Sequence, residues 1–534
     1  MEKALVSTYT DKLVAAYLAS LEEDKPQTSA TIKVHYATSL LALFFERIRN
    51  AIEYKDEHLL RRNAIERILR RRLSPRLGGN EMALPLLREL IRARYLKNDR
   101  VPVGRVEEVG AIIEKYKRLL EQALPLQPRN DAREIFEWLL SIAAAEIENV
   151  LVSDREREAF VELMYRFMTE NMQSQNDEVD PETKKFQVYI GVHRALVKSD
   201  EAILRFRLFL YYFPNWITES VDIKQTAEMI SGVKRQIDEH LRSPFGLRLF
   251  FFLKKHTAPF IILREAIAEN AAAALERFRD PTRLEESLRR VCRKKYTESK
   301  AKIGGQVVRA IIYIFLTKML LAVLLEFPAD KYIYKELNWL PLLINVFLPP
   351  FLMFLVAMTI HVPGEENTRV IISKIRAIVF HEPYLQEGDR SLTFSWYPPK
   401  RSRFLINAFR ILYLLAFVLT FGLIINILNR LDFTIVSSVI FIAFLSLVML
   451  FGLAIRNAAT ELATIGRRES PLAPFGDFLL LPILKVGHWL STEWAKINFF
   501  TFILDSVIEA PIKSFIEVAE EWIVFVREKK EEMG

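Results

Sequence analysis

The sequence predicts an all-α protein in which a large helical cytoplasmic domain precedes a four-helix transmembrane region and an amphipathic C-terminal helix. Two observations support this fold class. Before residue 303, apolar residues recur at helical spacing between turn signals, without a convincing alternating strand pattern. After residue 303, four apolar runs are each long enough to cross about 30 Å of hydrocarbon, which takes about 20 helical residues.

The first 302 residues read as helices separated by polar, proline-rich or glycine-rich segments. These segments are SPRLGGN at 74–80, PLQPRND at 125–131 and QSQNDEVDPETKK at 173–185. The last one is long, polar and acidic, so it is the best candidate for a subdomain boundary. We therefore expect one helical subdomain over 1–172 and a second over 186–302, which ends in a basic segment.

A basic run, RRNAIERILRRRLSPR at 61–76, carries its apolar residues on one helical face. Three interpretations remain open for its charges: pairing within the domain or simple solvation, contact with a membrane surface, and contact with nucleic acid. No zinc module, recognition motif or set of stacking aromatics accompanies the run, so nucleic acid is the least favoured partner.

A second basic run, RRVCRKK at 289–295, directly precedes the first apolar run. Lys and Arg at this position are typical of contact with anionic head groups, where each cation near the surface contributes about 1 kcal/mol. We expect these residues to bind lipid at the cytoplasmic face. They are Arg289, Arg290, Arg293, Lys294 and Lys295.

The four predicted spans, at 307–326, 339–360, 404–428 and 433–455, form a membrane domain over 303–456. Segments 289–302, 361–403 and 456–468 carry 17 Lys and Arg residues, whereas 327–338 and 429–432 carry three. Short cytoplasmic loops hold the excess of Lys and Arg. This predicts a multi-pass protein of the cell inner membrane with both termini in the cytoplasm.

Lys318 lies in the middle of the first span, and it is the least expected residue of the membrane domain. Asn345 on the second span is predicted at nearly the same depth, and Pro349 and Pro350 leave two carbonyls of that helix without their amide partners. No acidic residue is predicted well inside a span. We expect Lys318 either to extend to the outer head groups or to bond the Asn345 side chain and those carbonyls.

The C-terminal part, 457–534, contains two further apolar segments. The first, 478–490, is short and broken by Pro482 and Lys485, so it fits either an interfacial helix or a re-entrant piece. The second, 497–527, is an amphipathic helix with an acidic polar face, which fits poorly on anionic lipid. We expect it to dock on the basic surface of the same chain, near 61–76 or 289–302.

The sequence contains no recognisable catalytic motif. It lacks a phosphate-binding glycine loop, HExxH, CxxC and GxSxG, and its single cysteine excludes a multi-cysteine metal site within one chain. No cofactor is predicted and a non-enzymatic role is favoured. Three stretches resemble an uncharacterised bacterial family of multi-pass membrane proteins, a resemblance that implies no activity: IERILRRRL, LLRELIRARYLKN and FLMFLVAMTIHVPG.

Two functions follow from these observations. The first is a membrane-anchored helical scaffold or interaction protein, with a cytosolic protein as its expected partner, because the cytoplasmic part is large and the outer loops are very short. The second is a channel or transporter subunit that uses Lys318 and Asn345. Four spans in each chain would then require a homo-oligomer to enclose a path.

Overall fold

The structure is a computed structural model, and it confirms the all-α fold class. It describes residues 7–23, 30–34, 57–73, 77–175, 179–218, 221–334, 339–360, 362–380, 392–396, 402–464, 473–496 and 522. The predicted acidic helix at 497–527 lies almost entirely outside the described residues. The chain forms two compact units, 1–280 with 377–397 and 503–534, and 281–376 with 398–502. We call them the large helical unit and the span unit; the predicted division into four domains stays a prediction.

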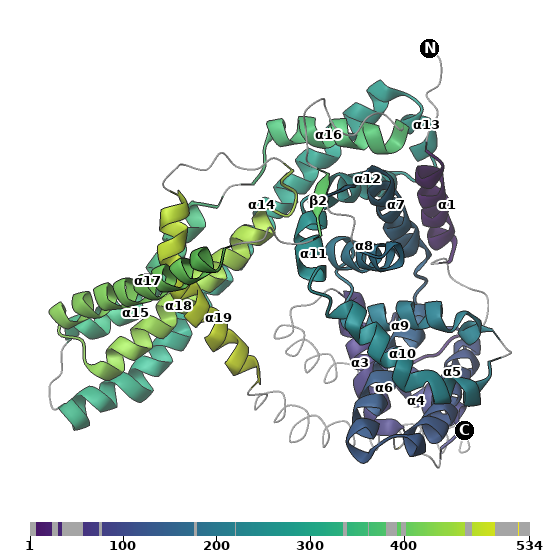
Figure 1. The fold of residues 1–534 in the computed structure, drawn as a ribbon, viewed down its shortest axis with the longest axis horizontal. Coiled ribbons are helices and arrows are strands. Elements are labelled where there is room, and N and C mark those ends of the chain that lie inside the picture. The colour runs from purple at the N-terminus through teal and green to yellow at the C-terminus, as the bar shows by residue number, and fades with distance from the viewer. Residues whose placement is uncertain are drawn as a thin grey trace, which may run out of the picture. The chain divides into compact units, whose positions relative to one another are not determined.

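The large helical unit contains twelve complete α-helices and two 3-10 turns in the described ranges, and Figure 1 labels these helices. They are α1 (Thr8–Glu23), α3 (Glu57–Arg72), α4 (Gly79–Arg92), α5 (Gly104–Ala123), α6 (Arg129–Leu151), α7 (Arg155–Asn171), α8 (Pro181–Leu196), α9 (Glu201–Tyr212), α10 (Ile223–Leu241), α11 (Gly246–Lys254), α12 (Thr257–Glu269), α13 (Ala274–Phe278) and the 3-10 turn η2 (Pro214–Ile217). A further 3-10 turn, η1 (Leu124–Leu126), follows α5. The strands β1 (Gln173–Gln175) and β2 (Thr393–Ser395) pair in parallel within the same unit.

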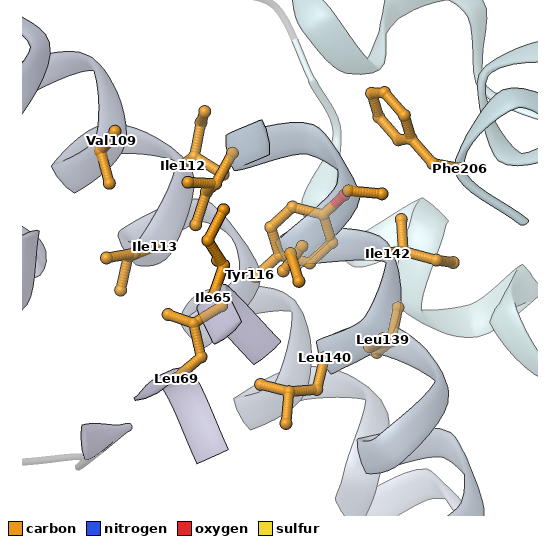
Figure 2. Close-up of a cluster of buried hydrophobic side chains, with 14 of the residues drawn as sticks. Ile65, Leu69, Val109, Ile112, Ile113, Tyr116, Leu139, Leu140, Ile142 and Phe206 are labelled. Carbon is orange, nitrogen blue, oxygen red and sulfur yellow. The ribbon is translucent and has the colours of Figure 1, made fainter. Parts of the chain in front are cut away.

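Apolar faces at helical spacing build the core of this unit. Figure 2 shows side chains from α3, α5, α6 and α9 converging, among them Ile65, Ile113, Leu139 and Phe206. Three helices begin at an aspartate whose carboxylate accepts a backbone N–H: Asp180 from Thr183, Asp200 from Ile203, and Asp222 from Gln225. Such caps satisfy amides that the first turn leaves without partners, and they fix where the helices start.

The basic run at 61–76 is largely paired within the large helical unit. Arg61 is buried and donates to the buried carboxylate of Glu148 at 2.9 Å. Arg70 pairs with Glu137 at 2.5 Å, and Arg71 donates to both carboxylate oxygens of Glu89. Of the three interpretations of this run, the structure therefore supports pairing within the domain for the arginines it describes.

The span unit contains the apolar helices. Its elements are α14 (Pro281–Leu321), the π-helical turns η3 (Ala322–Glu326) and η4 (Ala329–Tyr334), α15 (Trp339–Met358), most of α16 (Glu365–Phe380), α17 (Arg403–Arg430), α18 (Ile435–Ala459) and α19 (Ala473–Lys496). Among the described residues, four helical stretches are long and apolar enough to cross a membrane: 281–332, 339–358, 403–430 and 435–459. These stretches contain the four predicted spans, apart from a few terminal residues. The first is longer than predicted, because the helix begins at Pro281 and continues beyond Glu326.

Helices α14, α15 and α18 pack against one another, and α19 packs on α17 and α18. The contacts of α19 fall near the middle of both neighbours. Thr420 of α17 donates to the Leu479 carbonyl at 3.1 Å, and the Lys485 ammonium lies 5.3 Å from the centre of the Tyr413 ring. These contacts count against a helix that lies at the interface, and the re-entrant alternative for 478–490 stays a prediction.

Candidate functional site: a buried ion pair among the apolar helices

The site begins where α14 changes into wider π-helical turns. Lys318 lies in the last turn of α14, and Glu326, eight residues later, ends η3. In a regular α-helix, residues eight apart point about 80° away from each other. A π turn closes its hydrogen bonds one residue later and is wider, which reduces that difference in direction. The Lys318 Nζ atom lies 2.5 Å from Glu326 Oε1.

Two other helices complete the surroundings of this ion pair. The amide nitrogen Nδ2 of Asn345, on α15, donates to Glu326 Oε2 at 2.8 Å and to the Ser437 carbonyl of α18 at 3.2 Å. The ring of Phe444, also on α18, has its centre 5.0 Å from the Lys318 ammonium. Lys318, Glu326 and Asn345 are all 0% exposed. The Glu326 carboxylate thus joins Lys318 of α14 to Asn345 of α15, and Asn345 in turn binds α18.

The opposite charges explain how both groups are accommodated. A single charge at the centre of a bilayer costs about 2.5 to 3.5 kcal/mol on insertion scales, and more in simulations. Here the carboxylate neutralises the ammonium, and Asn345 satisfies the second carboxylate oxygen. Charge-assisted hydrogen bonds of this kind are roughly twice as strong as neutral ones.

The structure corrects the predicted surroundings of Lys318. Lys318 and Asn345 do approach each other, but each binds Glu326, and the Asn345 Oδ1 atom has no hydrogen-bond partner among the described residues. The predicted direct bond is therefore wrong, as is extension to the outer head groups, because Lys318 is enclosed. The error came from taking Glu326 as the end of the span. The helical path continues to Tyr334, so Glu326 lies inside the packed helices.

A second polar contact lies at the far end of the same helices. Asp330, in η4, is buried and accepts a hydrogen bond from Thr434 Oγ1 at 3.1 Å. Thr434 is the N-cap residue of α18, and its hydroxyl oxygen accepts the Ser437 amide at 3.3 Å. This contact fixes the start of α18 beside η4, and it holds the backbone of Ser437 where Asn345 reaches it.

The predicted lipid-contact residues occupy the first part of α14, and their surroundings differ. Arg289 pairs with Glu285 at 2.8 Å and with Glu365 of α16. Lys295 lies 3.4 Å from Glu298, and the exposed Arg290 also has an interaction partner. Arg293 and Lys294 are exposed and have no ion pair within the described ranges. These two cations are the best placed of the five to meet anionic head groups, and their contact with lipid stays a prediction.

Sequence reasoning missed Glu326, Ser437 and Phe444 as members of the site. A signal for Glu326 was present, because it is the first acidic residue after Lys318 on the same helix. Ser437 contributes a backbone carbonyl and Phe444 a ring face, and neither residue type is distinctive in an apolar run. Within the described part of the chain, no group of three His, Cys, Asp or Glu residues could hold a metal ion.

Comparisons with known proteins supply no relative for this chain. The resemblance of three stretches to a bacterial membrane-protein family therefore stays a prediction. No protein-family model, curated protein or solved structure matches this sequence.

Proposed function

We propose that this chain is a membrane-anchored helical interaction protein, in which the span unit holds the large helical unit at the cytoplasmic face of the cell inner membrane. The observation that carries this proposal is the closure of the buried site. Lys318, Glu326 and Asn345 are 0% exposed and bind one another. A conducting or transporting site has to meet water or its substrate, whereas an anchor needs its polar groups satisfied internally.

Reconstitution into liposomes tests the proposal. Purified full-length protein, incorporated with a fluorescent pH or anion indicator inside, is expected to give the same leak as empty liposomes. The charge-neutral double variant Lys318→Met/Glu326→Gln is expected to insert equally well and to give the same leak. The proposal would be overturned if the native protein gave flux above the level of empty liposomes and the double variant did not.

The second candidate, a channel or transporter subunit, is favoured by one specific observation. Ionisable residues inside membrane spans are functional sites by default, and π-helical turns are frequent at functional sites. This pair has both features, and the Asn345 Oδ1 atom is a buried acceptor without a hydrogen bond within the described residues. An opened state that brings water to Asn345 would give flux in the same liposome assay.

The proposed orientation places both termini in the cytoplasm. The exposed residue Asp432, between α17 and α18, would then face outward, and Ser299 would face inward. In intact cells, Asp432→Cys is expected to react with an impermeant maleimide, whereas Ser299→Cys reacts only after lysis. The native Cys292 is buried and is replaced by Ser in both variants. The reverse labelling pattern would refute the orientation.

A further inference from the structure

Helix α11 of the large helical unit carries apolar residues on two opposite faces, and only one of these faces is buried. Its sequence is GLRLFFFLK, and the buried face consists of Gly246, Leu249 and Leu253. On the opposite face Leu247 is 66% exposed and Phe251 is 53% exposed. A helix that is apolar on nearly every side is normally enclosed by protein or by lipid. The second face of α11 therefore lacks a cover within the described residues.

The exposed face forms one continuous patch. Phe250 is half-buried, and its ring centre lies 5.2 Å from that of Phe251. At about 100° of rotation for each residue, Leu247, Phe250 and Phe251 fall within about 100° of the helix circumference. We call these three residues the α11 patch. Large apolar patches on a protein surface mark sites of contact with another protein or with a membrane.

Two cations border the α11 patch. Lys254 and Lys255 are both exposed, and neither has an ion pair in the part of the chain that the structure describes. The Lys254 ammonium lies 5.8 Å from the centre of the Phe250 ring. The stretch 240–264 contains no Asp or Glu. Leu and Phe beside unpaired Lys are typical of helices that lie in a membrane interface, where the cations meet anionic head groups.

Contacts with β2 hold α11 from a different side. Arg248 donates to the Trp396 carbonyl at 3.0 Å, and the ring centres of Phe252 and Phe394 lie 5.2 Å apart. Figure 1 shows α11 beside β2. Positions 248 and 252 lie outside the arc of the helix that the α11 patch occupies. The contact with β2 therefore fixes α11 without using the patch.

Chain connectivity ties this part of the large helical unit to the membrane. Ser395 is the last residue of β2, and Phe404, nine positions later, begins the third predicted span. Nine residues reach at most about 30 Å, because an extended chain advances about 3.3 to 3.6 Å for each residue. Because α11 is fixed to β2, a bilayer that α17 crosses is the apolar surface closest along the chain to the α11 patch.

We propose that the α11 patch is a second membrane contact of this protein, in which Leu247, Phe250 and Phe251 enter the interface of the bilayer and Lys254 and Lys255 bind anionic head groups. The inference rests on the proposed function, because it requires the span unit to be inserted in a membrane. It adds an attachment that restricts how the large helical unit is oriented on the membrane surface.

The experiment measures whether lipid reaches the patch in the full-length protein. The buried Cys292 is replaced by Ser, and one introduced cysteine carries an environment-sensitive fluorophore. The protein is reconstituted into liposomes of phosphatidylcholine and phosphatidylglycerol that contain a lipid with a nitroxide on its acyl chain close to the head group. The fluorophore at Phe251→Cys is expected to lose fluorescence, because an interfacial helix buries its apolar face about 5 to 10 Å deep.

Two labelled control positions make the result interpretable. Met229→Cys, on α10 of the same unit, is 48% exposed in the native protein and is expected to keep its fluorescence. Leu419→Cys, near the middle of α17, is 56% exposed and is expected to lose fluorescence because it would face lipid. Leu247→Cys provides a second labelled position on the patch, and it is expected to behave as Phe251→Cys does.

The outcomes separate this inference from the proposed function. Quenching at Leu419 without quenching at Phe251 and Leu247 would overturn the α11 contact and leave the anchor intact. Equal quenching at Met229 and Phe251 would also overturn it. A blue-shifted spectrum at Phe251 without quenching would mean that protein rather than lipid covers the patch. Absence of quenching at Leu419 would overturn the anchor, and this inference with it.

The two lysines are tested in the protein labelled at Phe251→Cys. Lys254→Gln/Lys255→Gln is expected to lower the equilibrium constant for membrane contact by up to about 30-fold, since each cation contributes about 1 kcal/mol and about 1.4 kcal/mol is a factor of ten. The quenching should fall accordingly. The matched pair Lys224→Gln/Arg235→Gln, two exposed cations of α10, should leave it unchanged. An equal fall in both pairs would overturn the role of Lys254 and Lys255.

Discussion

Replacing Lys318 by Met tests whether the buried ion pair holds the span unit together. The substitution keeps the length and apolar volume of the side chain but leaves the Glu326 carboxylate without its cation. Glu326 is 0% exposed and would retain only the Asn345 amide as a partner. Breaking a buried pair by removing one partner costs about 3 to 5 kcal/mol, because the remaining charge is uncompensated.

The double variant Lys318→Met/Glu326→Gln separates this effect from simple loss of packing. Gln is neutral and keeps an oxygen that can accept the Asn345 amide. Replacing both members of a buried pair is often close to neutral, so we expect the second substitution to recover at least half of the loss. The measurement is unfolding in mixed micelles of a mild detergent and sodium dodecyl sulfate, followed by circular dichroism.

Lys331→Met is the matched control on the same helical path. Lys331 is exposed, and its ammonium lies 5.8 Å from the centre of the Phe327 ring. An exposed cation–π contact contributes about 0.5 to 1 kcal/mol, so the loss should be no larger than that. The reasoning is refuted if Lys318→Met costs no more than Lys331→Met, or if the double variant is no more stable than the single one.

Three further predictions concern packing and pH. Gly110→Ala would place a Cβ atom 1.8 Å from Asn80 Oδ1 and is expected to destabilise the α4–α5 contact by about 1 to 3 kcal/mol, measured by thermal melting. Gly104→Ala, whose Cβ atom would have nothing within 4 Å, should leave the melting temperature unchanged. Gly487→Ala would place a Cβ atom 2.3 Å from the Ser446 carbonyl oxygen, so we expect a lower yield of a disulfide cross-link engineered between α18 and α19. Gly476→Ala, whose Cβ atom would have nothing within 4 Å, should leave that yield unchanged. Burial, aided by Arg207 and Arg157, lowers the pKa of His193 to about 3. Between about pH 3 and pH 6.5 the unfolded chain then binds more protons than the folded one. The free energy of unfolding therefore falls by up to about 1.4 kcal/mol for each pH unit as the pH is lowered through that window. The melting temperature of His193→Gln should depend less on pH than that of the native protein.

The fold class and the positions of the apolar helices could be predicted from the sequence. Both follow from local properties: the length of an apolar run, the spacing of apolar residues along a helix, and turn-forming segments between helices. The second span starts at Trp339 both in the prediction and in the structure. Local signals also identified Lys318 and Asn345 as unusual residues, because a polar residue in an apolar run can be recognised without knowing which residues surround it in space.

The partners of these residues could not be predicted, because they depend on how the helices pack. Glu326 looked like the end of a span, and only the π-helical continuation of α14 places it on the side of Lys318. For the arginines of 61–76 the sequence left three interpretations open, because their partners, such as Glu89 and Glu148, come from other helices. Charge pairing depends on which faces are brought within about 4 Å, and that distance is set by helix packing rather than by separation along the chain.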